Sequence, residues 1–150
     1  ASMGFTDVVK ILLNNSADPN VADPFGATPL MKACRRGYEE IVRDMLDWGA
    51  NYNAHDDQGI TSLMRASRAG HLGVVKLLLE FPIDLEAADE HGNTALIMAS
   101  YRGHPEIVKL LLNEGAEINA QDRNGWTAMV WAVSRRNDEV VKALKEFRKK

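Results

Sequence analysis

The chain has 150 residues, of which 45% are hydrophobic and 26% charged, with 5 prolines and 11 glycines. This composition is that of an ordinary globular domain and excludes disordered, collagen-like and coiled-coil chains. A single cysteine excludes a disulfide framework, and no apolar stretch approaches the roughly 20 residues of a membrane-spanning helix. The net charge of −3 gives no indication of nucleic-acid binding or membrane insertion. With no signal peptide visible, we expect an intracellular protein, cytoplasmic or nuclear.

The sequence repeats itself at a step of 33 residues. Glycines, threonines, alanines and aspartates follow this step four times each, in series that begin at Gly26, Thr28, Ala33 and Asp23. Segments 57–89 and 90–122 share 14 of 33 positions without a gap. Self-similarity at such a period is typical of repeat proteins. The predicted units are a partial repeat at 1–23, complete repeats at 24–56, 57–89 and 90–122, and a C-terminal capping repeat at 123–150.

The partial repeat contributes only a second helix, predicted over residues 5–15. Val8, Ile11 and Leu12 would leave one flank of this helix uncovered. We therefore expect a chain cut from a longer array, or else a natural terminus covered by a partner, and self-association through this flank stays an open alternative. At the other end, lysines and glutamates make the helix over 138–150 largely polar, as a capping helix requires.

The complete repeats share one order of elements, which residues 89–120 illustrate. An Asp-x-x-Gly-x-Thr motif at 89–94 predicts a tight turn that ends in a helix N-cap. A short helix over 94–102 then ends at Gly103, and an amphipathic helix over 105–112 ends near Gly115. One such helix pair cannot bury its own apolar face, so neighbouring pairs must stack.

This pattern resembles the ankyrin repeat over the whole chain. The resemblance is carried by Gly26–Leu30, Gly37–Val42, Gly103–Leu112 and Gly115–Ala120. It implies an all-α fold, an ankyrin-repeat solenoid of stacked antiparallel helix pairs with β-turn fingers. It also implies binding of protein ligands across the finger tips and the exposed face of the first helices.

Three departures from the family pattern lead to structural expectations. Where the family usually has a histidine after Thr-Pro-Leu, apolar contacts are expected from Met31, Met64, Ile97 and Val130. Phe81-Pro82-Ile83 replaces a Gly-Ala pair, so this loop should differ from its equivalents. Arg136 replaces a helix-ending glycine, and a positive φ there would cost on the order of 1 kcal/mol.

The apolar positions that recur with the repeat predict the hydrophobic core. They are Leu30, Ala33, Leu46, Leu63, Ala66, Val75, Leu78, Leu79, Leu96, Ala99, Val108, Leu111 and Leu112.

Candidate catalytic chemistry is sparse. His71 and His104 occupy the same repeat position, which favours a hydrogen-bonded structural role over a metal site. Cys34 is equivalent to Ser67 and Ser100, which indicates a small packed side chain. No phosphate-binding loop or catalytic pair is visible, so we expect no enzymatic activity, no cofactor and no metal.

The predicted partner-binding surface combines finger tips with the outer face of the first helices. Seven of its twelve helix-face positions are basic and none is acidic, although the net charge of the chain is negative. Basic residues concentrate in the first two complete repeats, and aromatic and sulfur side chains in the last two. The predicted binding residues are Lys32, Arg35, Arg36, Arg65, Arg68, Met98, Tyr101, Arg102, Trp126, Trp131, Arg135, Phe25, Gln58 and His91.

Three functional hypotheses follow from this surface. The first is a protein–protein interaction module that binds a segment with acidic residues and an apolar anchor. The second is binding of a nucleotide or phosphorylated ligand, because arginines suit phosphate and aromatic rings stack on bases. The third is a structural segment of a longer array without a ligand of its own.

Overall fold

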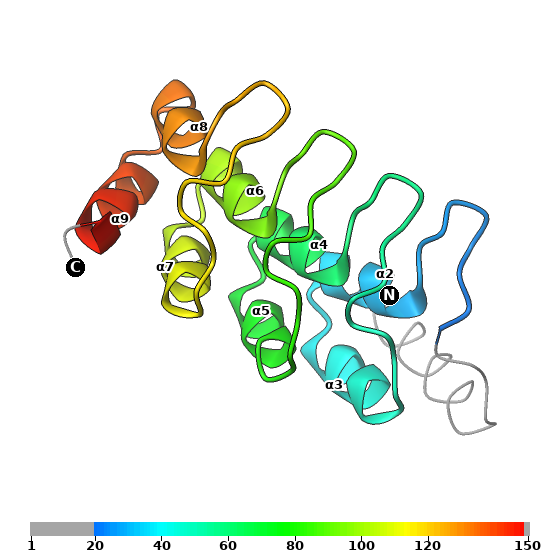
Figure 1. The fold of residues 1–150 in the computed structure, drawn as a ribbon. Helices are drawn as coiled ribbons and strands as arrows, with labels where there is room; N and C mark the ends of the chain where they lie inside the picture. Colours follow the sequence, from blue (N-terminus) through cyan, green and yellow to red (C-terminus); the bar gives the residue numbers. More distant parts are fainter. Residues whose placement is uncertain (1–19, 149–150) are drawn as a thin grey trace.

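The computed structural model describes residues 20–148 of the chain. In this part eight helices form two layers, each a row of four (Figure 1). The first-helix layer consists of α2 (Pro29–Arg36), α4 (Ser62–Ala69), α6 (Ala95–Arg102) and α8 (Ala128–Ser134). The second-helix layer consists of α3 (Glu39–Asp47), α5 (Leu72–Leu78), α7 (Pro105–Asn113) and α9 (Asp138–Arg148).

Each helix packs on its equivalent in the next repeat, so the chain forms an open stack. In the first-helix layer α2 packs on α4, α4 on α6 and α6 on α8, while the second layer follows the order α3, α5, α7, α9. The sole β feature of residues 20–148 is an isolated bridge between His55 and Thr61. The predicted all-α solenoid is therefore confirmed, whereas the residue limits of the repeats stay a prediction. The helix expected over 5–15 and its uncovered flank lie outside the described residues.

Repeated local chemistry begins each first helix. The hydroxyl oxygen of a threonine N-cap accepts the backbone N–H three residues further on, at 3.3 Å in all four repeats. These N-caps are Thr28, Thr61, Thr94 and Thr127. Because each cap satisfies a backbone donor that the helix itself cannot pair, the start of the helix is determined locally.

The first helices end on a residue in the left-handed region of backbone space. Gly70 takes φ 83° after α4, and a Cβ added there would lie 2.6 Å from the His104 ring. Arg136 takes the equivalent place after α8 with φ 57°, as predicted. An L-residue in this region is strained because its Cβ approaches the neighbouring carbonyl oxygen.

Replacing Arg136 by glycine is expected to raise the free energy of unfolding by about 1 kcal/mol, because glycine adopts this φ without a steric penalty. Urea denaturation followed by circular dichroism measures the change. Arg136→Ala is the matched control, since it removes the long side chain but keeps the strained Cβ. Equal stabilities of the glycine and alanine variants would contradict the strain argument.

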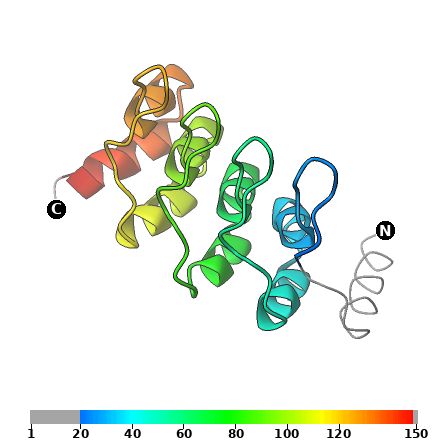
Figure 2. The same ribbon diagram turned by 45° about the vertical axis from the view of Figure 1, so that its right-hand side comes forward.

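The fingers are the loops 23–27, 56–60, 89–93 and 122–126, which stand in a row along one edge of the stack (Figure 2). Each is folded around its first aspartate; the Oδ1 of Asp56, for example, accepts the backbone N–H groups of Gln58 and Ile60 at 2.8 and 2.9 Å. Neighbouring fingers are joined by one backbone hydrogen bond, such as that from Asp57 to the carbonyl of Phe25 at 3.0 Å. These bonds restrain the relative positions of the tips.

The hydrophobic core lies between the two layers and agrees with the prediction at every position but one. Leu79, which follows the last residue of α5, is half-buried and packs at the edge of the core. The loop over 81–83 differs from its equivalents as expected: α5 has 7 residues, whereas α3 and α7 have 9. No residue in this loop has the positive φ that Gly49 and Gly115 adopt in the other repeats.

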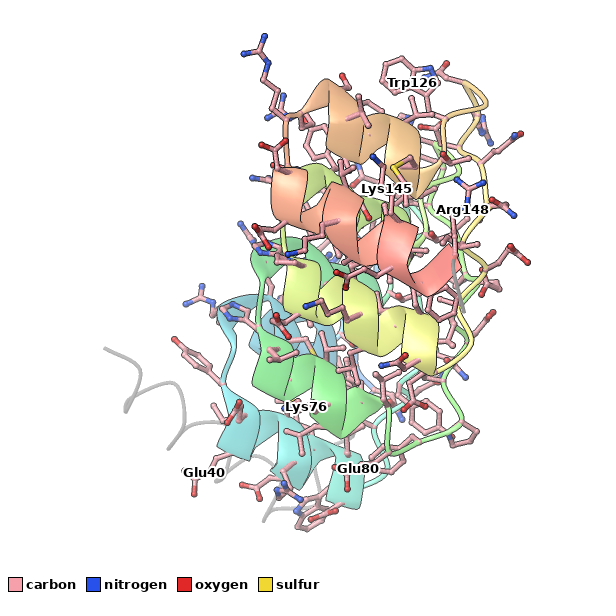
Figure 3. All side chains as sticks on the ribbon, turned by 90° about the vertical axis from the view of Figure 1, so that its left-hand side faces the viewer. Glu40, Lys76, Glu80, Trp126, Lys145 and Arg148 are labelled. Atoms are coloured by element: carbon pink, nitrogen blue, oxygen red, sulfur yellow. The ribbon has the colours of Figure 1, made fainter. Side chains whose placement is uncertain are left out.

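The C-terminal end of the stack corrects one expectation, that of an apolar contact for Val130. Met31, Met64 and Ile97 are buried as predicted, but Val130 is 41% exposed. Val130 and Val133 lie on α8, which is the last of the first helices in residues 20–148, so no further first helix of this part covers them. The capping repeat is therefore polar on α9, where Lys145 and Arg148 project outward (Figure 3), but not on α8.

The two histidines at equivalent repeat positions tie adjacent repeats together. The Nε2–H of His71 donates to the carbonyl oxygen of Arg35 at 2.9 Å, and that of His104 to the carbonyl oxygen of Arg68 at 3.0 Å. Asn137 replaces the histidine in the last repeat, and its amide donates to the carbonyl oxygen of Tyr101 at 3.0 Å. The predicted structural role of these histidines is confirmed.

Candidate functional site

A pocket of about 540 Å³ opens on the first-helix layer where α2, α4 and α6 meet the finger over 56–60. We call it the basic pocket, because its lining contains four arginines and no acidic residue. Its walls are Arg35, Gln58, Ile60, Met64, Arg65, Arg68, Ala69, Met98, Arg102 and His104. Three adjacent repeats therefore contribute to one concave site.

The arginines of the basic pocket fall into two groups. Arg65 is held by the finger that precedes its helix, since its Nη2 lies 2.7 Å from the Asp56 Oδ2 and its side chain is 17% exposed. Arg35, Arg68 and Arg102 are exposed, and their guanidinium groups form no ion pair or hydrogen bond with other residues of 20–148. Three positive charges therefore remain available to a ligand.

A second pocket, of about 370 Å³, lies next to the first and nearer the C-terminal end. We call it the aromatic pocket, because the side chains of Met98, Tyr101 and Trp131 form one wall. Asp89 and its neighbours in the finger over 89–93 also line the pocket. Gln58, Ile60, Arg68 and Met98 line both pockets, so the two form one continuous groove.

The aromatic side chains at this end form a connected cluster. The Tyr101 and Trp131 rings meet edge to face with centroids 5.0 Å apart, and the Trp126 ring lies 4.6 Å from that of Trp131. The Arg135 guanidinium lies 4.5 Å from the centroid of the Tyr101 ring. Figure 3 shows Trp126 on the last finger, at the end of the molecule away from Glu40 and Glu80.

Hydrogen bonds lower the pKa of two finger aspartates, Asp122 and Asp23. Burial raises the pKa of Asp122, but hydrogen bonds from the backbone of Trp126 and from the Trp131 indole outweigh it and hold the pKa below its ordinary value. The indole Nε1–H donates to the Asp122 Oδ2 at 2.8 Å. The pKa of Asp23 is lowered by the backbone N–H of Ala27 and by Lys32, whose Nζ lies 3.1 Å from the Asp23 Oδ2.

Nine of the fourteen predicted binding residues line the two pockets. The remaining five lie outside both: Phe25, Lys32, Arg36, Trp126 and Arg135. Four of the predicted residues are less exposed than expected: Met98 is 9% exposed, Tyr101 and Trp131 are half-buried, and Arg65 is paired with Asp56. Met98, Trp131 and Arg65 share a repeat position that faces a finger rather than solvent.

Several lining residues escaped the sequence analysis. The sequence indicates only a turn role for Asp89 and only an apolar contact for Met64, yet both line the groove. For Asp89 an indication was present in the sequence: the residue nine positions later is lysine, arginine or tryptophan in the other repeats and Met98 here. That difference predicts that the Asp89 carboxylate lacks the side-chain N–H donor that the other finger aspartates have.

Cys34 is buried in the core, and burial raises the pKa of its thiol to about 12. The predicted packing role is confirmed by its complete burial. We expect iodoacetamide at neutral pH to label Cys34 only when the protein unfolds, because the thiolate is the reactive form. Mass spectrometry of native and urea-unfolded samples tests this expectation, and rapid labelling of the native protein would contradict it.

Residues 20–148 contain no cluster of three or more metal-ligating side chains. In the same part of the chain, none of the helices is long and apolar enough to cross a bilayer.

The family model that describes ankyrin repeats in three copies matches residues 1–89 and 81–149. Among curated proteins, none matches the chain. Ankyrin repeats are in general protein–protein interaction modules and are typically not enzymes. The family match covers nearly the whole chain and agrees with the stacked helix pairs and turn fingers, so this chain belongs to the ankyrin-repeat family.

Proposed function

We propose that the chain binds an acidic segment of a partner protein in the groove formed by the basic and aromatic pockets. The observation that carries this proposal is the set of three exposed arginines, Arg35, Arg68 and Arg102, around one pocket without a carboxylate in its lining. In a chain of net charge −3, such a local excess of positive charge favours an anionic ligand.

The chemistry of the arginines suits carboxylates. A guanidinium presents a planar set of donors that binds a carboxylate through two parallel hydrogen bonds. Arg35 and Arg68 belong to successive repeats, so an extended segment that crosses the repeats meets them in turn. Complementary charge of this kind increases the association rate more than the final affinity.

The aromatic pocket would supply an apolar anchor. Tyr101 and Trp131 present ring surface at the groove, and Met98 lies between them and the arginines as part of both pockets. Tyrosine, tryptophan and arginine are the residues most enriched in the energetic centres of interfaces. An apolar side chain of the partner placed there would slow dissociation.

The double charge reversal Arg35→Glu/Arg68→Glu tests the proposal. The probe is a short fluorescein-labelled peptide of glutamates with a central leucine, and stopped-flow fluorescence at low salt measures its association rate. We expect at least about a tenfold decrease, with a weaker dependence on salt, because steering by the arginines is lost. Circular dichroism should show unchanged helix content, since both side chains are exposed.

Arg43→Glu/Lys142→Glu is the matched control. It changes the net charge equally, but on exposed residues of the second helices α3 and α9. Equal binding by the reversal and control variants would contradict the proposal. Strong competition by inorganic triphosphate, with a steep salt dependence, would favour a phosphorylated ligand instead. Binding of neither probe would favour a structural segment of a longer array.

A further inference from the structure

The four finger aspartates differ in what binds their second carboxylate oxygen. In three repeats the donor lies nine residues later: Lys32 Nζ for Asp23, Arg65 Nη2 for Asp56 and Trp131 Nε1 for Asp122, at 3.1, 2.7 and 2.8 Å. The repeat therefore places this oxygen where a long side chain with an N–H group reaches it. A cationic or polar donor on the groove side is the regular partner of this aspartate.

The finger that begins with Asp89 departs from this rule. The residue nine positions later is Met98, which has no N–H group to donate. The Oδ1 of Asp89 is used by the finger, because it accepts the backbone N–H groups of His91 and Asn93 at 2.9 Å each. Its Oδ2 has only a long contact of 3.5 Å from the Asn93 side-chain amide.

The surroundings of Asp89 are shaped to take a side chain from outside. Asp89 is half-buried and lines the aromatic pocket together with Met98, Tyr101 and Trp131. A pocket of about 370 Å³ is large enough for one long side chain. An alkyl stem would lie on the apolar wall while its charged end reached the carboxylate, as lysine and arginine stems do along apolar surfaces.

We propose that the aromatic pocket binds an arginine side chain of the partner, whose guanidinium donates to the Oδ2 of Asp89. Arginine is favoured because Arg65 already makes the equivalent bond to Asp56 in the preceding repeat, at 2.7 Å. The inference rests on the proposed function, because it requires a partner in the groove. It replaces the apolar anchor of the acidic segment proposed above by an arginine, whose alkyl stem would occupy the same apolar surface of the pocket.

The other charges at the pocket are compatible with this ligand. Glu90 lies at the same finger, with its carboxylate 3.4 Å from the His91 Nε2, and adds a second negative charge. The positive charge of Arg68 would repel a cationic ligand in the aromatic pocket, but Arg68 also lines the basic pocket, where a carboxylate of the partner could bind it. A partner carboxylate on Arg68 would offset this repulsion, so an acidic residue followed by an arginine fits the groove better than either alone.

Titration with single amino acids tests the inference without knowledge of the partner. The probe is N-acetyl-arginine amide, and N-acetyl-citrulline amide is its uncharged control of the same shape. In ¹H–¹⁵N spectra we expect the arginine probe to shift the Trp131 indole and the Asn93 side-chain amide saturably, with citrulline at least about tenfold weaker. The Trp48 indole, on α3's C-terminal end, serves as the internal reference.

Met98→Arg is the decisive variant, because it supplies from within the chain the donor that Arg65 provides to Asp56. We expect it to abolish the arginine-specific shifts, whereas Met98→Leu should retain them. Asp89→Asn keeps an oxygen that can accept the finger N–H groups, and it should also abolish the arginine-specific shifts. This second variant keeps the inference testable if Met98→Arg does not fold. N-acetyl-lysine amide measures whether a guanidinium is required, and we expect weaker binding.

Equal binding of arginine and citrulline, tighter binding of lysine, or unchanged binding to both Met98→Arg and Asp89→Asn would overturn the inference. Its failure is distinguishable from failure of the proposed function. The glutamate peptide depends on Arg35 and Arg68, whereas the arginine probe depends on Asp89, so each test can fail while the other succeeds.

Discussion

Replacing Leu111 by alanine is expected to lower the free energy of unfolding by about 2–5 kcal/mol, the usual cost of a cavity in a packed core. Leu111 is completely buried in α7. This helix packs against α5, α6 and α9, so the lost contacts belong to three repeats. Rigid helices on several sides prevent the site from collapsing around the smaller side chain.

Urea denaturation followed by far-UV circular dichroism measures this loss. Lys109→Ala is the control on the same helix, because Lys109 is exposed and its contact with Glu106 is long, at 3.5 Å. That variant should change stability by less than about 0.5 kcal/mol. A Leu111→Ala variant as stable as the Lys109→Ala variant would show that the buried face of α7 is assigned incorrectly.

Replacing Trp131 by alanine is expected to lower the free energy of unfolding by about 2–3 kcal/mol. From the sequence, Trp131 is expected to be a binding residue on the exposed face of the first helices. The structure contradicts that expectation. The indole is half-buried between Tyr101 and Trp126, and it donates to the Oδ2 of Asp122. Its removal takes away both the ring contacts and a hydrogen bond to a buried carboxylate.

Trp131→Arg is the informative control. Arg65 makes the same bond to Asp56 in an earlier repeat, so an arginine at 131 should restore the bond to Asp122 and part of the lost stability. Scanning calorimetry of both variants separates loss of ring packing from loss of the hydrogen bond. A Trp131→Ala variant as stable as the original chain would show that this indole contributes only to binding.

Acid titration provides an independent test of the bond between Trp131 and Asp122. The pKa of Asp122 is lowered in the folded chain, so its contribution to stability is complete above the ordinary value of 3.8 and is lost as the pH falls through the lowered value. Without the indole the pKa lies closer to its ordinary value. The Trp131→Ala variant should therefore lose less stability between about pH 4 and pH 2 than the original chain.

The repeated local features of this protein could be predicted from the sequence. The threonine N-caps and turn aspartates form hydrogen bonds within a few residues of their own position, so the same residues produce the same local structure in each repeat. The strain at Arg136 was visible because the three preceding repeats have glycine there. The inter-repeat role of His71 and His104 followed in the same way from their shared position.

Exposure along the groove was decided only by the tertiary structure. Lys32, Arg65, Met98 and Trp131 share one repeat position, and the sequence predicts all four on the exposed face of the first helices. In the fold this position faces the finger that precedes its helix, so the side chain there is paired, buried or stacked according to what it can donate. The Asp89 Oδ2 is available because the residue nine positions later, Met98, has no N–H group to donate to it. These two residues come into proximity only when the finger folds onto the helix.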